Sequence, residues 1–80
     1  MSDPLTTSFG HIIRQRREAV GLSQEELGAK TNLSRNYIGM VERGETNPTL
    51  LVLHGLAKAL NTTMRSLIDE LETGTTDKKP

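Results

Sequence analysis

Two short amphipathic segments separated by three residues constrain this 80-residue chain more than any other feature. Ser23–Lys30 opens with Ser-Gln-Glu-Glu, a capping box in which the serine hydroxyl and the glutamate three residues later satisfy backbone amides. Ser34–Arg43 again begins with a serine cap. Because so short a connection cannot lay two helices side by side, they must cross steeply. Asn32 tolerates the left-handed conformation that the turn needs, and Gly28 offers no side chain where the helices approach.

Apolar residues recur every three or four positions elsewhere in the chain, which predicts further helices and no sheet. These helices span about residues 8–20, 49–60 and 63–72. Ser8 is the expected cap of the first. The segment from residue 49 is capped either by Asn47, with Pro48 in the first turn, or by Thr49, and the pattern does not choose between them. The predicted fold class is all-α, with five helices.

The expected organisation is one helical domain over residues 8–72. A flexible N-terminal arm over residues 1–7 precedes it, and a disordered tail rich in glycine, threonine and charge follows over residues 73–80. No apolar run approaches the roughly 18 residues that a membrane helix needs, and no secretion signal opens the chain. We therefore expect no membrane partner and a cytoplasmic location.

Side chains that could carry metal or covalent chemistry are few. The chain has no cysteine, and neither of its two histidines has a second ligand at helical spacing. No nucleophile stands with a base and an orienting partner. The sequence therefore predicts no metal, no cofactor and no enzymatic activity.

Five ordered motifs follow one another along the chain. They are Gly21-Leu22-Ser23-Gln24-Glu25-Glu26-Leu27, Asn32-Leu33-Ser34-Arg35-Asn36-Tyr37-Ile38, Glu42-Arg43-Gly44, Asn47-Pro48-Thr49-Leu50 and Leu56-Ala57-Lys58-Ala59-Leu60. Over about residues 9–71 the chain closely resembles the helix-turn-helix domain of the Cro/repressor (XRE) type. The resemblance implies a compact five-helix, lambda-repressor-like domain that binds double-stranded DNA. Among such proteins, the chain is similar to restriction–modification controller proteins and to small phage or plasmid repressors.

The resemblance also implies roles for individual residues, because the second helix of the pair lies in the major groove. Arg35, Asn36 and Met40 are the expected base contacts, to guanine, to adenine and to a thymine methyl respectively. The expected contacts to the DNA backbone are Gln24, Tyr37, Arg43 and Asn47, and the expected structural ion pair is Arg17 with Glu42. Each has a plainer alternative: a solvated charge, a packed tyrosine or a partly buried methionine. Arg14 and Arg16 are expected on a solvated face.

The last two helices carry a longer apolar stripe than a monomer of this size needs. Its members are Leu60, Met64, Leu67, Ile68 and Leu71. Left uncovered, the surplus would be an exposed patch, and a symmetric partner would cover it. We therefore expect a homodimer whose recognition helices lie about 34 Å apart on a palindromic operator.

Charge is balanced, with ten Lys and Arg against ten Asp and Glu, which argues against a generally basic nucleic-acid-binding protein. Residues 1–43 hold six basic and five acidic residues, and residues 44–80 hold four and five. This predicts weak non-specific binding, with affinity resting on correct bases and on two subunits. The predicted function is a sequence-specific transcriptional regulator, with RNA polymerase as a further candidate partner. The alternative is an antitoxin-like or adaptor module that uses the same fold to bind protein.

Overall fold

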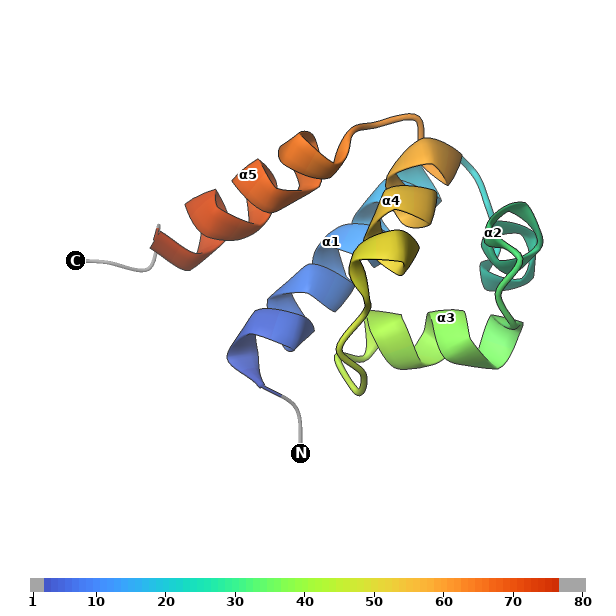
Figure 1. Ribbon diagram of the computed structural model, residues 1–80, viewed down its shortest axis with the longest axis horizontal. Helices are drawn as coiled ribbons and strands as arrows, with labels where there is room; N and C mark the ends of the chain where they lie inside the picture. Colours follow the sequence, from blue (N-terminus) through green and yellow to red (C-terminus); the bar gives the residue numbers. More distant parts are fainter. Residues whose placement is uncertain (1–2, 77–80) are drawn as a thin grey trace.

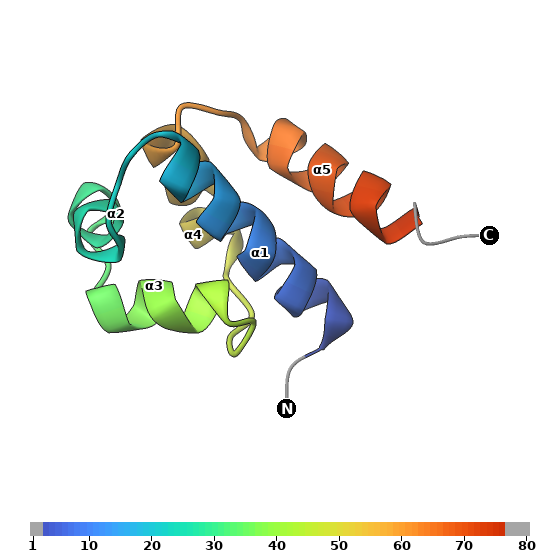
Figure 2. The ribbon, with the colours of Figure 1, turned by 180° about the vertical axis from the view of Figure 1, so that it is seen from behind.

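Residues 3–76 are described by the computed structural model, and they form five α-helices and no strand (Figure 1). The helices are α1 (Pro4–Ala19), α2 (Gln24–Thr31), α3 (Arg35–Glu42), α4 (Leu50–Ala59) and α5 (Met64–Thr76). The all-α prediction is confirmed. Helix α1 packs against α3 and α5, while α2 packs against α3 and α4 (Figures 1 and 2). The pair α2–α3 thus occupies one end of the molecule, and α5 lies away from it.

Helix α1 begins four residues earlier than the sequence pattern indicates. Asp3 is its N-cap, and one carboxylate oxygen accepts a hydrogen bond of 2.8 Å from the backbone N–H of Leu5. Pro4 takes the first helical position, where a missing N–H costs nothing. The predicted cap at Ser8 is therefore wrong, and residues 4–7 are helical rather than a flexible arm. The Thr6 hydroxyl donates to the carbonyl of Gly44 at 3.1 Å, which ties this first turn to the loop after α3.

Helix α5 runs past the predicted boundary at residue 72. Residues 73–76 belong to the helix, so the predicted tail is wrong for these four residues. The rest of that predicted tail, residues 77–80, and residues 1–2 of the predicted arm lie outside the described residues. At the other end of α5, the Thr63 hydroxyl accepts a hydrogen bond of 3.0 Å from the backbone of Ser66.

The other helix starts follow their local signals. The capping box is complete, because Ser23 Oγ accepts from the N–H of Glu26 at 3.0 Å while Glu26 Oε1 accepts from the N–H of Ser23 at 2.8 Å. Asn32 has φ 60° and turns the chain between α2 and α3 as predicted. The open choice at α4 is resolved, since Thr49 is its cap and accepts from the N–H of Val52.

The capping box makes stability depend on pH. The hydrogen bonds with Ser23 lower the pKa of Glu26. Because the folded pKa lies below the unfolded value of about 4.3, this contribution is present above that pH and is lost as pH falls through the folded pKa. We expect Glu26→Gln to flatten the acid limb of a plot of Tm against pH. Glu25→Gln is the control, since it removes the neighbouring charge and leaves the box intact. Equal effects of the two variants would contradict the prediction.

The core receives apolar side chains from all five helices. Its buried members are Phe9, Ile12, Ile13, Leu27, Ile38, Val41, Leu56, Ala57, Leu60, Leu67 and Leu71. Leu60, Leu67 and Leu71 were predicted at a dimer interface, and that assignment is wrong, because the protomer buries them in its own core. Helix α5 lies against α1 and uses its apolar stripe there. Of the predicted set, Met64 is partly buried against the core and Ile68 remains exposed.

Two glycines determine how closely the helices approach. A Cβ on Gly28 would stand 2.6 Å from the carbonyl oxygen of Leu33, so the tight turn after α2 has no room for one, as predicted. A Cβ on Gly10 of α1 would meet the carbonyl oxygens of Val41 and Glu42. The C-terminal end of α3 therefore rests directly on the backbone of α1.

Candidate nucleic-acid interface

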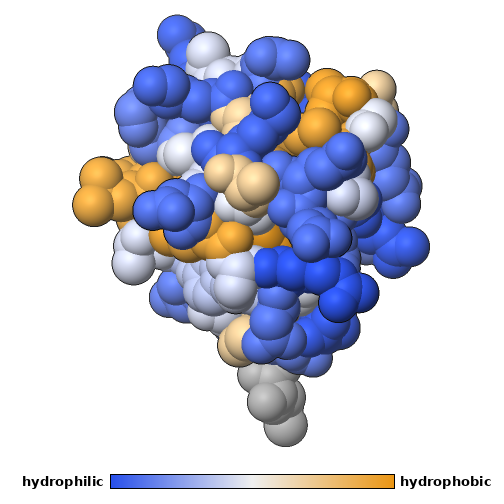
Figure 3. All heavy atoms as spheres, turned by 90° about the vertical axis from the view of Figure 1, so that its right-hand side faces the viewer, coloured by the Kyte–Doolittle hydropathy of each residue, from blue (hydrophilic) through white to orange (hydrophobic). Residues whose placement is uncertain are grey.

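Helix α3 has a buried face and an exposed face. Ile38 and Val41 enter the core. The Ser34 hydroxyl accepts a hydrogen bond of 3.0 Å from the N–H of Tyr37 and starts the helix, so that Arg35 and Asn36 lie exposed in its first turn. Figure 3 views the end of the molecule at which α2 and α3 lie, and hydrophilic atoms cover most of it. The exposed first turn of α3 is thus free to meet another molecule.

A single carboxylate joins α1, α2 and α3. Glu42 Oε2 accepts from Arg17 Nε at 2.7 Å, and Oε1 accepts from Arg17 Nη2 at 3.1 Å. The side-chain amide of Gln24 donates to the same Oε1 at 3.0 Å. Only 11% of the Arg17 side chain and 3% of the Glu42 side chain are exposed. The hydrogen bond with Glu42 raises the pKa of Arg17. The hydrogen bonds that Arg17 and Gln24 donate to Glu42 fix the three helices relative to one another.

Arg43, at the end of α3, has a partner that the sequence reasoning missed. Its Nε donates to Glu45 Oε2 at 3.0 Å, and its Nη2 donates to Glu45 Oε1 at 3.2 Å. This hydrogen bonding raises the pKa of Arg43 and lowers that of Glu45. Opposite charges on the two sides of Gly44, which turns the chain with φ +75°, are the signal that was available.

Only some of the predicted DNA-contacting residues lie close together in the structure. Gln24, Arg35 and Arg43 line one open hollow, together with Arg17 and Arg14. Arg14 is exposed, as predicted, and pairs with Glu18 on the same helix. Arg16 points elsewhere and donates to Glu70 and Ser66 on α5.

The remaining predicted contacts lie outside that hollow. Tyr37 and Met40 are half-buried, and Tyr37 packs against the core. Asn36 is exposed beside Arg35. Asn47 lines a separate groove with Leu5, at the start of α1.

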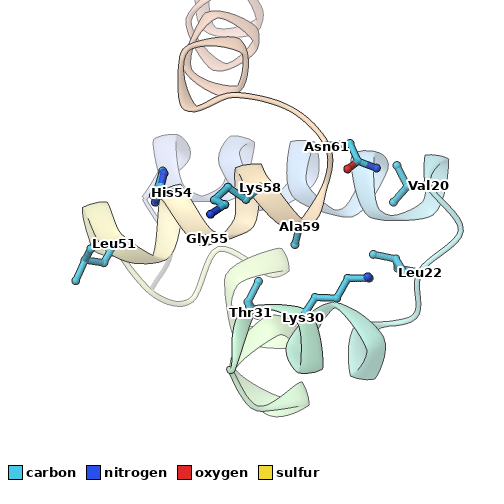
Figure 4. A pocket seen from close by; sticks show the side chains of 10 residues that line it. All are labelled: Val20, Leu22, Lys30, Thr31, Leu51, His54, Gly55, Lys58, Ala59 and Asn61. Atoms are coloured by element: carbon cyan, nitrogen blue, oxygen red, sulfur yellow. The ribbon is translucent and has the colours of Figure 1, made fainter.

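A second hollow lies between α2 and α4 (Figure 4). Its lining residues are Val20, Leu22, Lys30, Thr31, Leu51, His54, Gly55, Lys58, Ala59 and Asn61. His54 lies among these residues, and none of the described residues that line the hollow is an aspartate or a glutamate that could orient its imidazole. Across residues 3–76 no three His, Cys, Asp or Glu side chains are grouped to hold a metal ion. None of the helices in that range is long and apolar enough to span a bilayer.

Residues 13–67 of the chain match the helix-turn-helix family HTH_3. Among curated relatives, the uncharacterized HTH-type transcriptional regulator y4dJ of Sinorhizobium fredii is 43% identical over 68 residues, which cover 81% of this chain and 87% of that protein. Control protein C.SmaI of Serratia marcescens is 50% identical over 56 residues, covering 70% of this chain and 67% of its own.

Solved structures with the same architecture include two restriction–modification controller proteins. The crystal structure of C.AhdI from Aeromonas hydrophila superposes with a TM-score of 0.76 at 44% identity, covering 78% of this chain and 94% of the other. Wild-type C.Esp1396I superposes with a TM-score of 0.85 at 28% identity, covering 95% and 99%. The five-helix arrangement and the sequence motifs therefore point to the same group of proteins.

Proposed function

The chain belongs to the helix-turn-helix family of DNA-binding transcriptional regulators, and we propose that it is a homodimeric controller that reads a palindromic operator. The main support is the clustering of Gln24, Arg35 and Arg43 around the exposed face of α3. Arginine guanidinium groups bind guanine edges and phosphates bidentately, which suits them to a DNA groove. We further propose that it controls a restriction–modification system, because several similar proteins are controllers of such systems.

The proposed contacts follow the geometry of α3. Arg35 and Asn36 project from its first turn and would meet base edges, while half-buried Met40 would reach at most a thymine methyl. Gln24, Tyr37 and Asn47 are proposed to contact phosphates. Arg43 is exposed at the end of α3, where both bases and phosphates are within the reach of an arginine.

The proposed dimer keeps Ile68 from the interface expected on sequence grounds and adds exposed residues at the start of α4. Leu50 and Leu51, at the start of α4, are 71% and 82% exposed. One turn later Leu53 lines an apolar groove with Phe9 and with Ile68 of α5. Because protruding leucines and groove adjoin one another, a two-fold axis can place the leucines of each subunit against the groove of the other. A second copy of this chain is therefore the proposed occupant.

No observation favours the alternative, an antitoxin-like or adaptor module. Polar and charged residues, not apolar ones, cover the exposed face of α3. We propose that the protein acts without enzymatic activity in the cytoplasm, where a regulator meets both DNA and RNA polymerase.

Selection of DNA fragments by the purified protein, repeated at several salt concentrations, tests the function. We expect enrichment of a palindrome, with an affinity that falls steeply as salt increases because bound phosphates release counterions. Absence of any enriched sequence, together with absence of salt dependence, would refute DNA recognition. The antitoxin-like alternative requires that no sequence is enriched and that binding does not depend on salt.

Arg35→Ala tests direct reading of a base. If Arg35 binds a guanine through two hydrogen bonds, Arg35→Ala should abolish the base preference at one base pair in each half-site. The discrimination lost there should be about 1–3 kcal/mol. Binding constants for operator variants at that position give the measurement. Arg16→Ala is the matched control, since it removes an arginine that hydrogen-bonds to α5. A uniform loss of affinity for all sequences would instead mark Arg35 as a phosphate contact.

A further inference from the structure

The guanidinium group of Arg43 donates hydrogen bonds along one edge and has free donors along the other. Glu45 accepts from Nε and Nη2, which form the side edge of the group. Arginine has five N–H donors in one plane, so the N–H groups of the Nη1–Nη2 edge remain available. No other hydrogen bond of this group occurs within residues 3–76. The remaining edge has the two parallel donors that match O6 and N7 of guanine.

Gly39 determines where that open edge lies. A Cβ built on Gly39 would stand 3.0 Å from Nη1 of Arg43 and 3.7 Å from its Cζ. The guanidinium group therefore rests against α3, directly beside the place that a Cβ at position 39 would take. Gly39 is one turn after Arg35 on the same helix, so Nη1 lies along the helix that faces the groove in the proposed function.

We propose that Arg43 reads a guanine through its Nη1–Nη2 edge, with Glu45 as its positioning residue and Gly39 as the gap that admits it. This proposal rests on the proposed function and replaces the backbone contact that the resemblance implied for Arg43. The carboxylate of Glu45 fixes the plane of the guanidinium before DNA arrives. It also carries a negative charge that disfavours a nearby phosphate, so the arrangement favours a base edge over the DNA backbone.

Binding to a set of operator variants tests the proposal with Arg43→Lys, Glu45→Ala and Gly39→Ala. Lysine keeps the charge but lacks two coplanar donors, so Arg43→Lys should lower the preference for guanine at one base pair per half-site by about 5- to 150-fold. Its affinity for random DNA and its salt dependence should change little. Glu45→Ala should weaken the same preference by about 2- to 5-fold without lowering affinity for random DNA.

Gly39→Ala separates reading from folding. The new Cβ would stand 3.0 Å from Nη1, so the guanidinium group must shift by a few tenths of an ångström, and the preference at the same base pair should weaken. Alanine also favours the helix over glycine, so Tm should rise rather than fall. If Gly39 had only a structural role, the variant would not combine a higher Tm with a weaker base preference.

Glu25→Ala is the control for charge, because Glu25 is exposed and lines the same hollow as Arg35. It should raise affinity for all sequences and leave the base preference intact. The proposal is overturned if Arg43→Lys retains the full guanine preference. It is also overturned if Glu45→Ala, like Glu25→Ala, raises affinity for all sequences and leaves the base preference intact. If the wild-type protein enriches no sequence, the proposed function itself fails. An enriched palindrome whose preferences are the same in all three variants refutes only this inference.

Discussion

Arg17→Met is expected to lower the free energy of unfolding by about 3–5 kcal/mol, because it leaves the buried Glu42 carboxylate without its cation. For a domain of this size, that corresponds to a fall in Tm of at least about 12 °C. Chemical and thermal denaturation of the purified variant measure the loss. Gln24 still donates one hydrogen bond to Glu42, but a single amide does not neutralise the charge.

Two further variants show whether the loss comes from the unpaired charge. Arg14→Met breaks an exposed pair with Glu18, which is typically worth less than about 1 kcal/mol, and serves as the control. The double variant Arg17→Met/Glu42→Leu removes both charges and should be more stable than Arg17→Met alone. A cost for Arg17→Met no larger than that of Arg14→Met would show that the pair does not hold the helices together.

The double substitution Leu50→Glu/Leu51→Glu is expected to abolish the proposed dimer and leave the fold intact, since both side chains are exposed in the single chain. Sedimentation should then report the monomer mass. Because two half-sites are read together only by a dimer, operator affinity should fall by about 10²- to 10⁴-fold. Four charges placed across the two-fold contact oppose association.

Val20→Glu is the matched control for the dimer, because it adds charge at another exposed apolar side chain. It should leave the mass unchanged. A dimeric mass for the double variant would exclude α4 as the contact. Leu71→Glu does not test the interface, because it would place a charge in the core of the protomer.

Local signals in the sequence predicted most of the fold. Ser23, Ser34 and Asn32 act through hydrogen bonds or backbone angles within a few residues of themselves, and each lies as predicted. The start of α1 was missed because residues before Ser8 lack an apolar period. The signal there was Asp3 followed by Pro4, a cap and a first-turn proline.

Tertiary partners were beyond the reach of the sequence pattern. The sequence pattern of an apolar stripe on α5 is the same whether a helix of the same chain or a second subunit covers it. Leu67 and Leu71 were therefore assigned to a dimer interface, although they lie in the core. The hydrogen bond between Gln24 and Glu42 spans 18 positions and depends on how α2 and α3 cross. Only the resemblance to a known family placed Arg17 and Glu42 together before the structure did.

Helix α3 keeps its core residues and its exposed residues on separate faces, and this separation affects which substitutions the protein can tolerate during evolution. Ile38, Val41 and Glu42 hold the helix in place, whereas Arg35 and Asn36 contribute nothing to the core. Substitutions at the second pair can therefore accumulate at nearly constant stability. Under the proposed function, a change in those few codons would alter which operator the protein reads, while the residues that hold the helix in place stay under separate selection.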